Sequence, residues 1–183
     1  FGLFFELGFH TFIFEVIATI GFGFIVLSLL LKSSLKTIGI AGLVIIFCHN
    51  LISLIPLPDG SIIKTILSVL FGLNAFPVTS HTVFIMAYPP LPWLGIMLVG
   101  FASGKFFELT EKERKSLFVK IGLGALLLFI VIRFRNIEGY PGQGAALKNA
   151  LYTFLSFMNI TKYPPSLLFC LIPLGIMFLI FAF

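Results

Sequence analysis

Three polar side chains stand inside long apolar stretches of this sequence: Glu15, His49 and Asn50. Ionisable groups are costly inside a lipid bilayer, so they are candidates for function wherever they occur there. An imidazole can serve as a general base, and a carboxylate beside it can hold it in one tautomer or stabilise its charged form. We therefore take His49 and Glu15 as candidate catalytic residues and Asn50 as a candidate substrate contact.

The depth of these groups follows from the helices expected to carry them. Residues 12–31 and 37–55 are each long and apolar enough to cross a bilayer, and each has a basic residue at one end. Glu15 then lies about 25 Å, and His49 about 20 Å, from the basic end of its helix. In an antiparallel pair the two side chains would meet at similar depth. The alternative is a polar link that only joins two helices.

A second set of polar residues is expected at one membrane face, where it could line a cleft for a sugar-like or anionic substrate. His81, at the expected start of another helix, is a further candidate base. Trp93 could stack on a sugar ring or anchor its helix at the interface. Ordinary snorkelling of long side chains is the alternative for the basic residues. The remaining candidate substrate contacts are Arg135, Asn136, Lys162 and Tyr163.

Several classes of site are excluded by the motifs. The sequence has no His-Glu-x-x-His or Cys-x-x-Cys spacing, so we expect no metal centre. It also has no Gly-x-Ser-x-Gly elbow. Gly139, Gly142 and Gly144 do not follow a strand, which argues against a dinucleotide fingerprint. Cys48 and Cys170 lie in apolar runs and are expected to be buried free thiols.

Composition indicates an integral membrane protein. Hydrophobic residues make up 59% of the 183 residues and charged residues 10%, and mean hydropathy is +1.14. Soluble domains usually carry about 25% charged residues. The net charge of +5 comes from short clusters at the ends of apolar runs, so we expect a lipid bilayer and no nucleic acid as partner. The sequence lacks an initiator Met and ends in an apolar run, so we expect an internal piece of a longer protein.

The expected fold is all-α: one transmembrane helix bundle over residues 1–183 with five spanning helices and two short interfacial or re-entrant ones. A tilted span over residues 62–78 is the alternative to one of the short helices. Whether the chain forms a homo-oligomer is left open. The expected spans are residues 12–31, 37–55, 81–107, 117–134 and 165–183, and the short helices are residues 62–71 and 145–160.

Basic residues orient this bundle. Lys32 and Lys36 lie in one connection between helices, and Lys105 starts another. These two connections fall on the same side if the first four helices each cross once and the short segment between them does not cross. The positive-inside rule places that side in the cytoplasm. Residues 56–81 and 133–165 then face outward.

Two Tyr-Pro-Pro sequences mark breaks at the edges of apolar runs, at residues 88–90 and 163–165. Membrane helices tolerate such breaks because neighbouring helices satisfy the freed backbone groups. Gly95, Gly100 and Gly104 follow the first break at roughly helical spacing, and we expect these small residues to let helices approach closely.

The order of these motifs resembles the bacterial membrane family related to heparan-α-glucosaminide N-acetyltransferase. The matching elements cover most of the chain, and Lys162-Tyr-Pro-Pro-Ser-Leu is the most specific of them. The chain lacks the Asp-x-x-Arg-Gly segment with which that family opens. The other matching elements are His49-Asn50, Pro92-Trp93-Leu94-Gly95, Arg133-Phe134-Arg135-Asn136 and Phe154-Leu155-Ser156-Phe157.

The resemblance implies a multi-helix bundle that transfers an acetyl or other acyl group from cytosolic acyl-CoA to a sugar or glycan, in the bacterial cytoplasmic (inner) membrane. His49 or His81 would take the proton of the acceptor. Lys32, Lys36 and Lys105 would meet the phosphates of the CoA. No metal would be needed. The alternative is a transporter or permease for a small solute or lipid, because broken helices and polar groups at mid-depth also occur in transporters.

Overall fold

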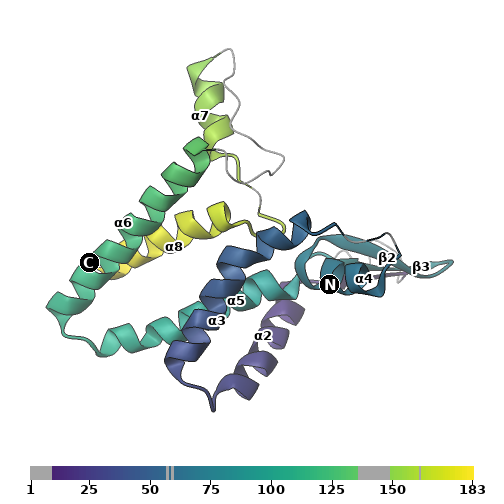
Figure 1. Ribbon diagram of the computed structural model, residues 1–183, viewed down its shortest axis with the longest axis horizontal. Helices are drawn as coiled ribbons and strands as arrows, with labels where there is room; N and C mark the ends of the chain where they lie inside the picture. Colours follow the sequence, from purple (N-terminus) through teal and green to yellow (C-terminus); the bar gives the residue numbers. More distant parts are fainter. Residues whose placement is uncertain (1–9, 57, 59, 136–148, 161) are drawn as a thin grey trace. The chain divides into compact units, whose positions relative to one another are not determined.

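The computed structural model describes residues 10–56, 58, 60–135, 149–160 and 162–183. Most of these residues are helical, as the sequence predicts. The chain divides into two compact units, Phe1–Ala102 and Ser103–Phe183, each treated by itself below. Figure 1 shows the elements of both. A single transmembrane domain stays a prediction.

Three helices form the body of the first unit: α2 (Val16–Leu30), α3 (Leu35–Cys48) and α5 (Pro90–Ser103) (Figure 1). Ser34 begins α3, because its hydroxyl accepts a hydrogen bond from the Thr37 N–H at 3.1 Å. The buried side chains of the cluster come from α3 and α5, and apolar side chains of all three helices pack around them. They are Ile38, Leu94 and Leu98.

Helices α3 and α5 cross at glycines. A β-carbon built on Gly42 would lie 2.8 Å from the carbonyl oxygen of Gly95, and one built on Gly95 would lie 2.9 Å from Ile45. Gly39 faces Ala102 in the same crossing. Since rising residue numbers on α3 meet falling numbers on α5, the two helices are antiparallel.

Prolines begin α5 rather than interrupting a longer helix. Pro90 is its first residue and Pro92 its third. The N–H groups at these positions would have no partner within the helix, so proline is tolerated there. The predicted span over residues 81–107 is therefore wrong in its first part, and of its three glycines only Gly95 lies at a close contact. Gly100 and Gly104 have no described atom within 4 Å of a built β-carbon.

A small sheet precedes α2 and α5 in the chain, and the sequence analysis missed it. Strand β3 (Thr82–Met86) lies between β1 (Thr11–Phe14), which is parallel to it, and β2 (Asn74–Thr79), which is antiparallel. Thr11 pairs with Val83, and Phe14 with Met86. The prediction of an all-α chain is wrong here because a short apolar run does not distinguish a strand from the end of a helix.

Because strands occupy some of the residues predicted as helix, several helix boundaries differ from the predicted ones. Residues 11–14 are a strand, so the first helix begins at Val16 instead of residue 12. Helix α4 (Ile62–Phe71) is confirmed as a short helix, and the tilted span over residues 62–78 is wrong because β2 follows α4. Beyond α3 the chain continues as the 3₁₀ helix η1 (His49–Leu54).

The second unit contains η2 (Gly104–Glu108), a 3₁₀ helix, then α6 (Glu111–Arg135), α7 (Ala150–Met158) and α8 (Leu167–Phe181). α6 starts six residues before the expected position and includes the charged residues that precede the apolar run. α7 lies within the expected short helix, whose first residues, 145–148, are outside the described part. α8 begins after Ser166, whose hydroxyl accepts the Phe169 N–H at 3.0 Å.

Helices α6 and α8 also pack through facing glycines. A β-carbon on Gly122 would lie 2.8 Å from the carbonyl oxygen of Gly175, and one on Gly175 would lie 3.2 Å from that of Gly122. An aromatic cluster closes the end of this pair. Phe118 is fully buried and lies 5.4 Å from Phe178 and 5.3 Å from Phe107, between ring centroids.

Among the described residues, three helical segments are long and apolar enough to cross a membrane. Two of the five expected spans are shorter than the thickness of a bilayer, because α2 and α8 have 15 residues each. A 15-residue helix is about 22 Å long, whereas the hydrocarbon core is about 30 Å thick. The three long segments are Leu35–Ile52, Pro90–Glu108 and Glu111–Arg135.

Candidate functional site

His49 lies where α3 ends and η1 begins, and its side chain is buried, with 5% exposed. Its Nδ1 lies 2.9 Å from the carbonyl oxygen of Ile46 and 3.0 Å from that of Ile45. These carbonyls belong to the last turn of α3. The change from α-helix to 3₁₀ helix at this residue thus coincides with a side chain bonded back onto the helix.

The two carbonyl contacts decide the tautomer of His49. A carbonyl oxygen can only accept a hydrogen bond, so Nδ1 must carry the proton. In the neutral ring the lone pair is then on Nε2. The sequence analysis considered a carboxylate for this task, and the oxygens that contact Nδ1 are backbone oxygens of the same helix.

The neighbours of His49 along the helix axis follow from the crossing of α3 and α5. Gly95 contacts Ile45 and Ile46, which precede His49 by about one helical turn. Trp93 lies two residues before Gly95 on α5. Because the two helices are antiparallel, His49 and Trp93 are both displaced toward the same end of the pair. Each is displaced by about 3–6 Å from the crossing.

Two contacts hold the start of α5 at that end. The buried Thr19 hydroxyl of α2 donates to the carbonyl oxygen of Tyr88 at 3.0 Å. The Tyr88 ring packs against Trp93, with centroids 5.7 Å apart and an angle of 36° between the planes. Both residues are half-buried. Trp93 therefore packs on the tyrosine of the Tyr-Pro-Pro sequence.

Glu15 lies at the N-cap position of α2, about one turn before Thr19, and its carbonyl oxygen accepts the Thr19 N–H at 3.0 Å. It is half-buried. The expectation that Glu15 lies inside a helix is wrong, because the strand β1 ends just before it. Asn50 follows His49 in η1 and is also half-buried. The pairing of Glu15 with His49 stays a prediction.

The basic residues expected to meet acyl-CoA are all exposed. Lys32 follows the C-terminal end of α2, and Lys36 lies in the first turn of α3, so both lie at the short connection between these helices. This is the opposite end of α3 from His49. Lys105 is in η2, in the second unit.

The candidate residues that the sequence analysis placed at the outer membrane face do not all lie in one unit. His81 is exposed in the turn between β2 and β3, where its N–H donates to the Thr79 hydroxyl at 3.2 Å. It does not begin a helix. Arg135, at the end of α6, and Lys162 and Tyr163, before α8, belong to the second unit and are exposed. Lys162 Nζ lies 5.1 Å from the centre of the Tyr163 ring. Asn136 lies outside the described residues.

Arg133 has a role that the sequence analysis did not assign. Only 8% of it is exposed, and its guanidinium donates to three main-chain oxygens at the end of α7. The distances are 2.6 Å to Ser156, 2.8 Å to Phe157 and 2.9 Å to Asn159. A cation at the last carbonyls of a helix is favoured by the helix dipole, and here it adds to the Asn159 N–H that the Ser156 oxygen also accepts. Arg133 precedes its three partners by 23–26 residues in the chain, so no local sequence pattern predicted this contact.

Phe157 completes this junction between α6 and α7. Its ring lies 5.7 Å from that of Phe129 and 5.3 Å from that of Phe134, both on α6. Figure 1 shows α7 beside the C-terminal end of α6. Phe157 and Arg133 thus both join α7 to the C-terminal part of α6.

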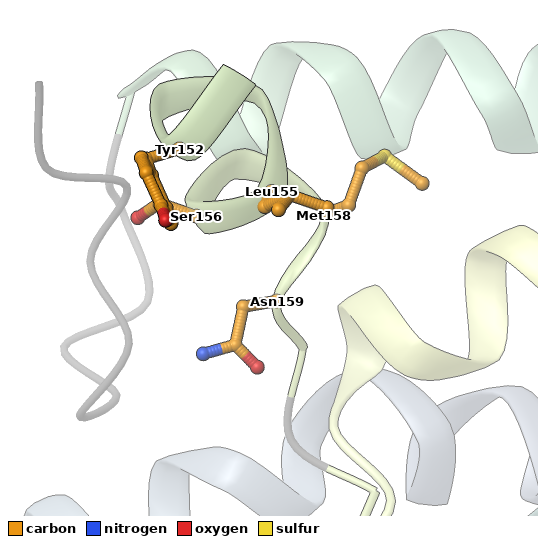
Figure 2. A pocket seen from close by; sticks show the side chains of 5 residues that line it. All are labelled: Tyr152, Leu155, Ser156, Met158 and Asn159. Atoms are coloured by element: carbon orange, nitrogen blue, oxygen red, sulfur yellow. The ribbon is translucent and has the colours of Figure 1, made fainter. Parts of the chain in front are cut away.

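A hollow of about 560 Å³ lies on α7 and the residue that follows it. Figure 2 shows Tyr152 and Ser156 on the same side of the helix, Asn159 beyond its end and Met158 directed away from them. The candidate catalytic and substrate residues do not line this hollow. Its lining residues are Tyr152, Leu155, Ser156, Met158 and Asn159.

Within the described ranges, no three His, Cys, Asp or Glu side chains are grouped so as to hold a metal ion. Comparisons of the chain with protein-family models, with curated proteins and with solved structures give no match.

Proposed function

We propose that this chain belongs to an integral membrane acyltransferase of the bacterial cytoplasmic membrane. It would transfer an acyl group from acyl-CoA on the cytoplasmic side to a sugar or glycan acceptor on the outer side. The proposal is supported by the three bilayer-length apolar helices and by the motif order that resembles the N-acetyltransferase family. In this proposal α2 and α8 also cross the membrane, with tilt or local thinning of the bilayer.

The observation that carries the proposal is the Nδ1 contact of His49 with the carbonyl oxygens of Ile45 and Ile46. It supports an Nδ1–H tautomer whose Nε2 is the basic atom, held in a buried position near the end of a bilayer-length helix segment. An oriented neutral imidazole is what a general base requires.

The proposed step is direct transfer. The hydroxyl or amine of the acceptor attacks the thioester carbonyl, a bond forms between the acceptor atom and the acyl carbon, and the carbon–sulfur bond breaks. His49 Nε2 takes the proton of the acceptor and passes it to the CoA sulfur. Glu15 and His81 remain alternative acid–base groups in this scheme.

The donor would enter from the basic side. In this proposal Lys32 and Lys36, at the α2–α3 connection, bind CoA phosphates, and Lys105 does the same in the second unit. The thioester must then travel about 20 Å along α3, from the depth of Lys36 to that of His49. Residues proposed to contact the acceptor are Asn50, Trp93, Arg135, Asn136, Lys162 and Tyr163.

The test uses membranes that contain the full-length protein, supplied with radiolabelled acetyl-CoA and a mixture of amino sugars and glycans. His49→Asn is the informative variant. The amide nitrogen of asparagine can occupy the place of Nδ1 and keep a hydrogen bond to Ile45 or Ile46, but it provides no base. His10→Ala is the matched control, because His10 is exposed and its contact with Val83 is made by its carbonyl oxygen.

We expect His49→Asn to retain the expression and thermal stability of the wild type and to lower acyl transfer by about 10²–10⁴-fold, the usual contribution of a general base. Full activity in His49→Asn would show that His49 is structural. Loss of activity in His81→Ala alone would indicate that His81, in the turn between β2 and β3, is the general base. Absence of acyl-CoA binding by the wild type would contradict the enzyme proposal itself.

One observation favours the transporter as the second candidate. The apolar segment Leu35–Ile52 changes from α-helix to 3₁₀ helix at His49 and Asn50, so polar residues coincide with a change in helix type. Such discontinuous helices line solute sites in transporters. Solute uptake into vesicles without consumption of acyl-CoA would support this candidate over the enzyme.

A further inference from the structure

Helix α4 carries apolar side chains on one face and polar side chains on the other. Successive residues of a helix are turned by about 100°, so four apolar residues fall within about one third of the circumference and three polar residues within the opposite third. Such segregation is typical of a helix at the boundary between an apolar and an aqueous phase. The apolar residues are Ile62, Ile63, Ile66 and Leu70, and the polar ones are Lys64, Thr65 and Ser68.

The described part of the chain leaves the apolar face of α4 uncovered. The structure describes all ten residues of this helix, and none of them is buried. Ile62, Ile63 and Ile66 are 77%, 60% and 52% exposed. A surface helix of a globular unit normally turns its apolar stripe toward the core. The three exposed isoleucines therefore require an apolar partner other than the described part of the chain.

Hydroxyl groups on the polar face of α4 are bonded within the chain. The Thr65 hydroxyl donates to the carbonyl oxygen of Ser61 at 3.3 Å, and the Ser68 hydroxyl donates to that of Thr65 at 2.8 Å. At the C-terminal end, the carbonyl oxygen of Ser68 accepts the Gly72 N–H at 2.9 Å and the Asn74 side-chain amide at 3.1 Å. These hydroxyls and this helix end need no further protein partner, so the apolar face is the surface that selects one.

The chain connects α4 directly to a helical segment of bilayer length. Leu35–Ile52 is long and apolar enough to cross a membrane, and α4 begins ten residues after its end. Ten residues span at most about 36 Å, so α4 remains within reach of the membrane face at which that segment ends. With ten residues, or about 15 Å, α4 is itself too short to cross the hydrocarbon core. The apolar phase that lies within its reach is the lipid at this face.

We propose that α4 lies in the plane of the membrane, with its three exposed isoleucines toward the acyl chains and with Thr65 and Ser68 toward the headgroups. Its partner is the lipid surface on the side where Leu35–Ile52 ends. The sequence analysis left an interfacial and a re-entrant position open, and the segregated faces favour the interfacial one. Because Asn74, the first residue of β2, bonds to the last turn of α4, the helix anchors the sheet at this face. The proposal rests on the membrane placement and is independent of acyl transfer.

The test measures the depth of a fluorescent amino acid placed at single positions of the full-length protein in phosphatidylcholine vesicles. It replaces Ile62 on the apolar face or Thr65 on the polar face, with Leu127 of α6 as the bilayer-core position and Lys112 as the aqueous position. All four side chains are exposed, so the label is not expected to disturb packing. Iodide on both sides of the membrane quenches the label from water. Lipids with a nitroxide near the headgroup (shallow) or near the end of the acyl chain (deep) quench it from within the bilayer.

We expect the shallow nitroxide to quench the label at position 62 more than the deep one does, and iodide to be the main quencher at position 65. Position 127 should be quenched by the deep nitroxide, and position 112 by iodide alone. Quenching by iodide alone at position 62, with lipid quenching retained at 127, would overturn the interfacial placement. Deep quenching at both 62 and 65 would indicate a re-entrant helix and would also overturn it. Quenching by iodide alone at 127 would contradict the membrane placement itself.

A matched pair of variants tests whether the apolar face holds α4 in the lipid. With the label at position 62, Ile66→Glu should lower shallow quenching several-fold, because a carboxylate one turn from the label is costly among acyl chains. Thr65→Glu adds the same charge to the polar face and should leave the quenching unchanged. Equal effects of the two changes would show that the position of α4 does not depend on its apolar face, and would overturn the proposal.

Discussion

Gly42 of α3 and Gly95 of α5 meet with no room for a side chain: a β-carbon on Gly42 would lie 2.8 Å from the main-chain oxygen of Gly95 and 2.9 Å from the Leu98 side chain. Real β-carbons almost never approach another atom this closely. Small residues allow membrane helices to pack with their backbones in contact, where apolar burial alone gives little preference between protein and lipid. This crossing sets the depth of His49 relative to α5.

Gly42→Ala should destabilise the first unit. The new methyl meets a backbone oxygen that cannot rotate away, and such overpacking costs about 1–3 kcal/mol, more than the helix propensity that alanine adds. Gly100→Ala, on the facing helix α5, is the control because its β-carbon meets no described atom within 4 Å. Thermal unfolding in detergent should show a lower melting temperature for Gly42→Ala only. Equal melting temperatures would mean that the crossing is looser than described.

Gly122→Ala should have a similar effect on the second unit. Its methyl would lie 2.7 Å from Leu179 and 2.8 Å from the oxygen of Gly175, whereas Gly124→Ala, on the same helix, meets no described atom. We expect a loss of about 1–3 kcal/mol in the unfolding free energy for the first change and a neutral or slightly stabilising effect for the second. Denaturant titration of the two variants checks this, and an unaltered midpoint in Gly122→Ala would contradict the glycine contact.

Arg133→Met should release the end of α7. It leaves three main-chain oxygens without the guanidinium, and hydrogen bonds to charged groups contribute about 1.5–3 kcal/mol each, although not additively. Hydrogen exchange of the α7 amides should become at least about 10-fold faster, which corresponds to about 1.4 kcal/mol. Arg133→Lys should restore part of the protection because one ammonium cannot span all three oxygens.

The matched control for that change is Arg135→Met, two residues further along α6, where the side chain is exposed. Its exchange pattern in α7 should equal that of the wild type. If both methionine variants accelerate exchange to the same extent, α7 depends on the overall positive charge at this end of α6 and not on the bonds of Arg133.

Thr19→Val should loosen the start of α5. Valine keeps the shape of threonine but removes the hydroxyl that bonds the main-chain oxygen of Tyr88, and such a hydrogen bond contributes about 0.5–1.5 kcal/mol. Thr19→Ser keeps the hydroxyl and should stay closer to the wild type. The measurement is thermal stability together with tryptophan fluorescence of Trp93, which packs on Tyr88. An unchanged stability in Thr19→Val would show that another group satisfies this oxygen.

Much of the helical framework could be predicted from the sequence because its signals are local. The apolar runs, the charges that flank them and the position of proline at a helix start indicated α3, α4, α6 and α8 approximately. The strands could not be predicted in the same way. Residues 11–14 and 82–86 are short apolar runs that continue into helical ones, and only their pairing with each other distinguishes them.

The candidate site shows the same division. The sequence by itself determined that His49 is an ionisable group in an apolar run, that a Tyr-Pro-Pro break stands at the edge of the apolar runs that hold α5 and α8, and that basic residues flank the apolar runs. Only the tertiary structure decided that Gly42 meets Gly95, that Thr19 bonds to Tyr88 and that Arg133 caps α7 across at least 23 residues. Local patterns record hydrophobicity and backbone preference, whereas these contacts join residues distant in the chain, and their partners are mostly backbone atoms that any sequence provides.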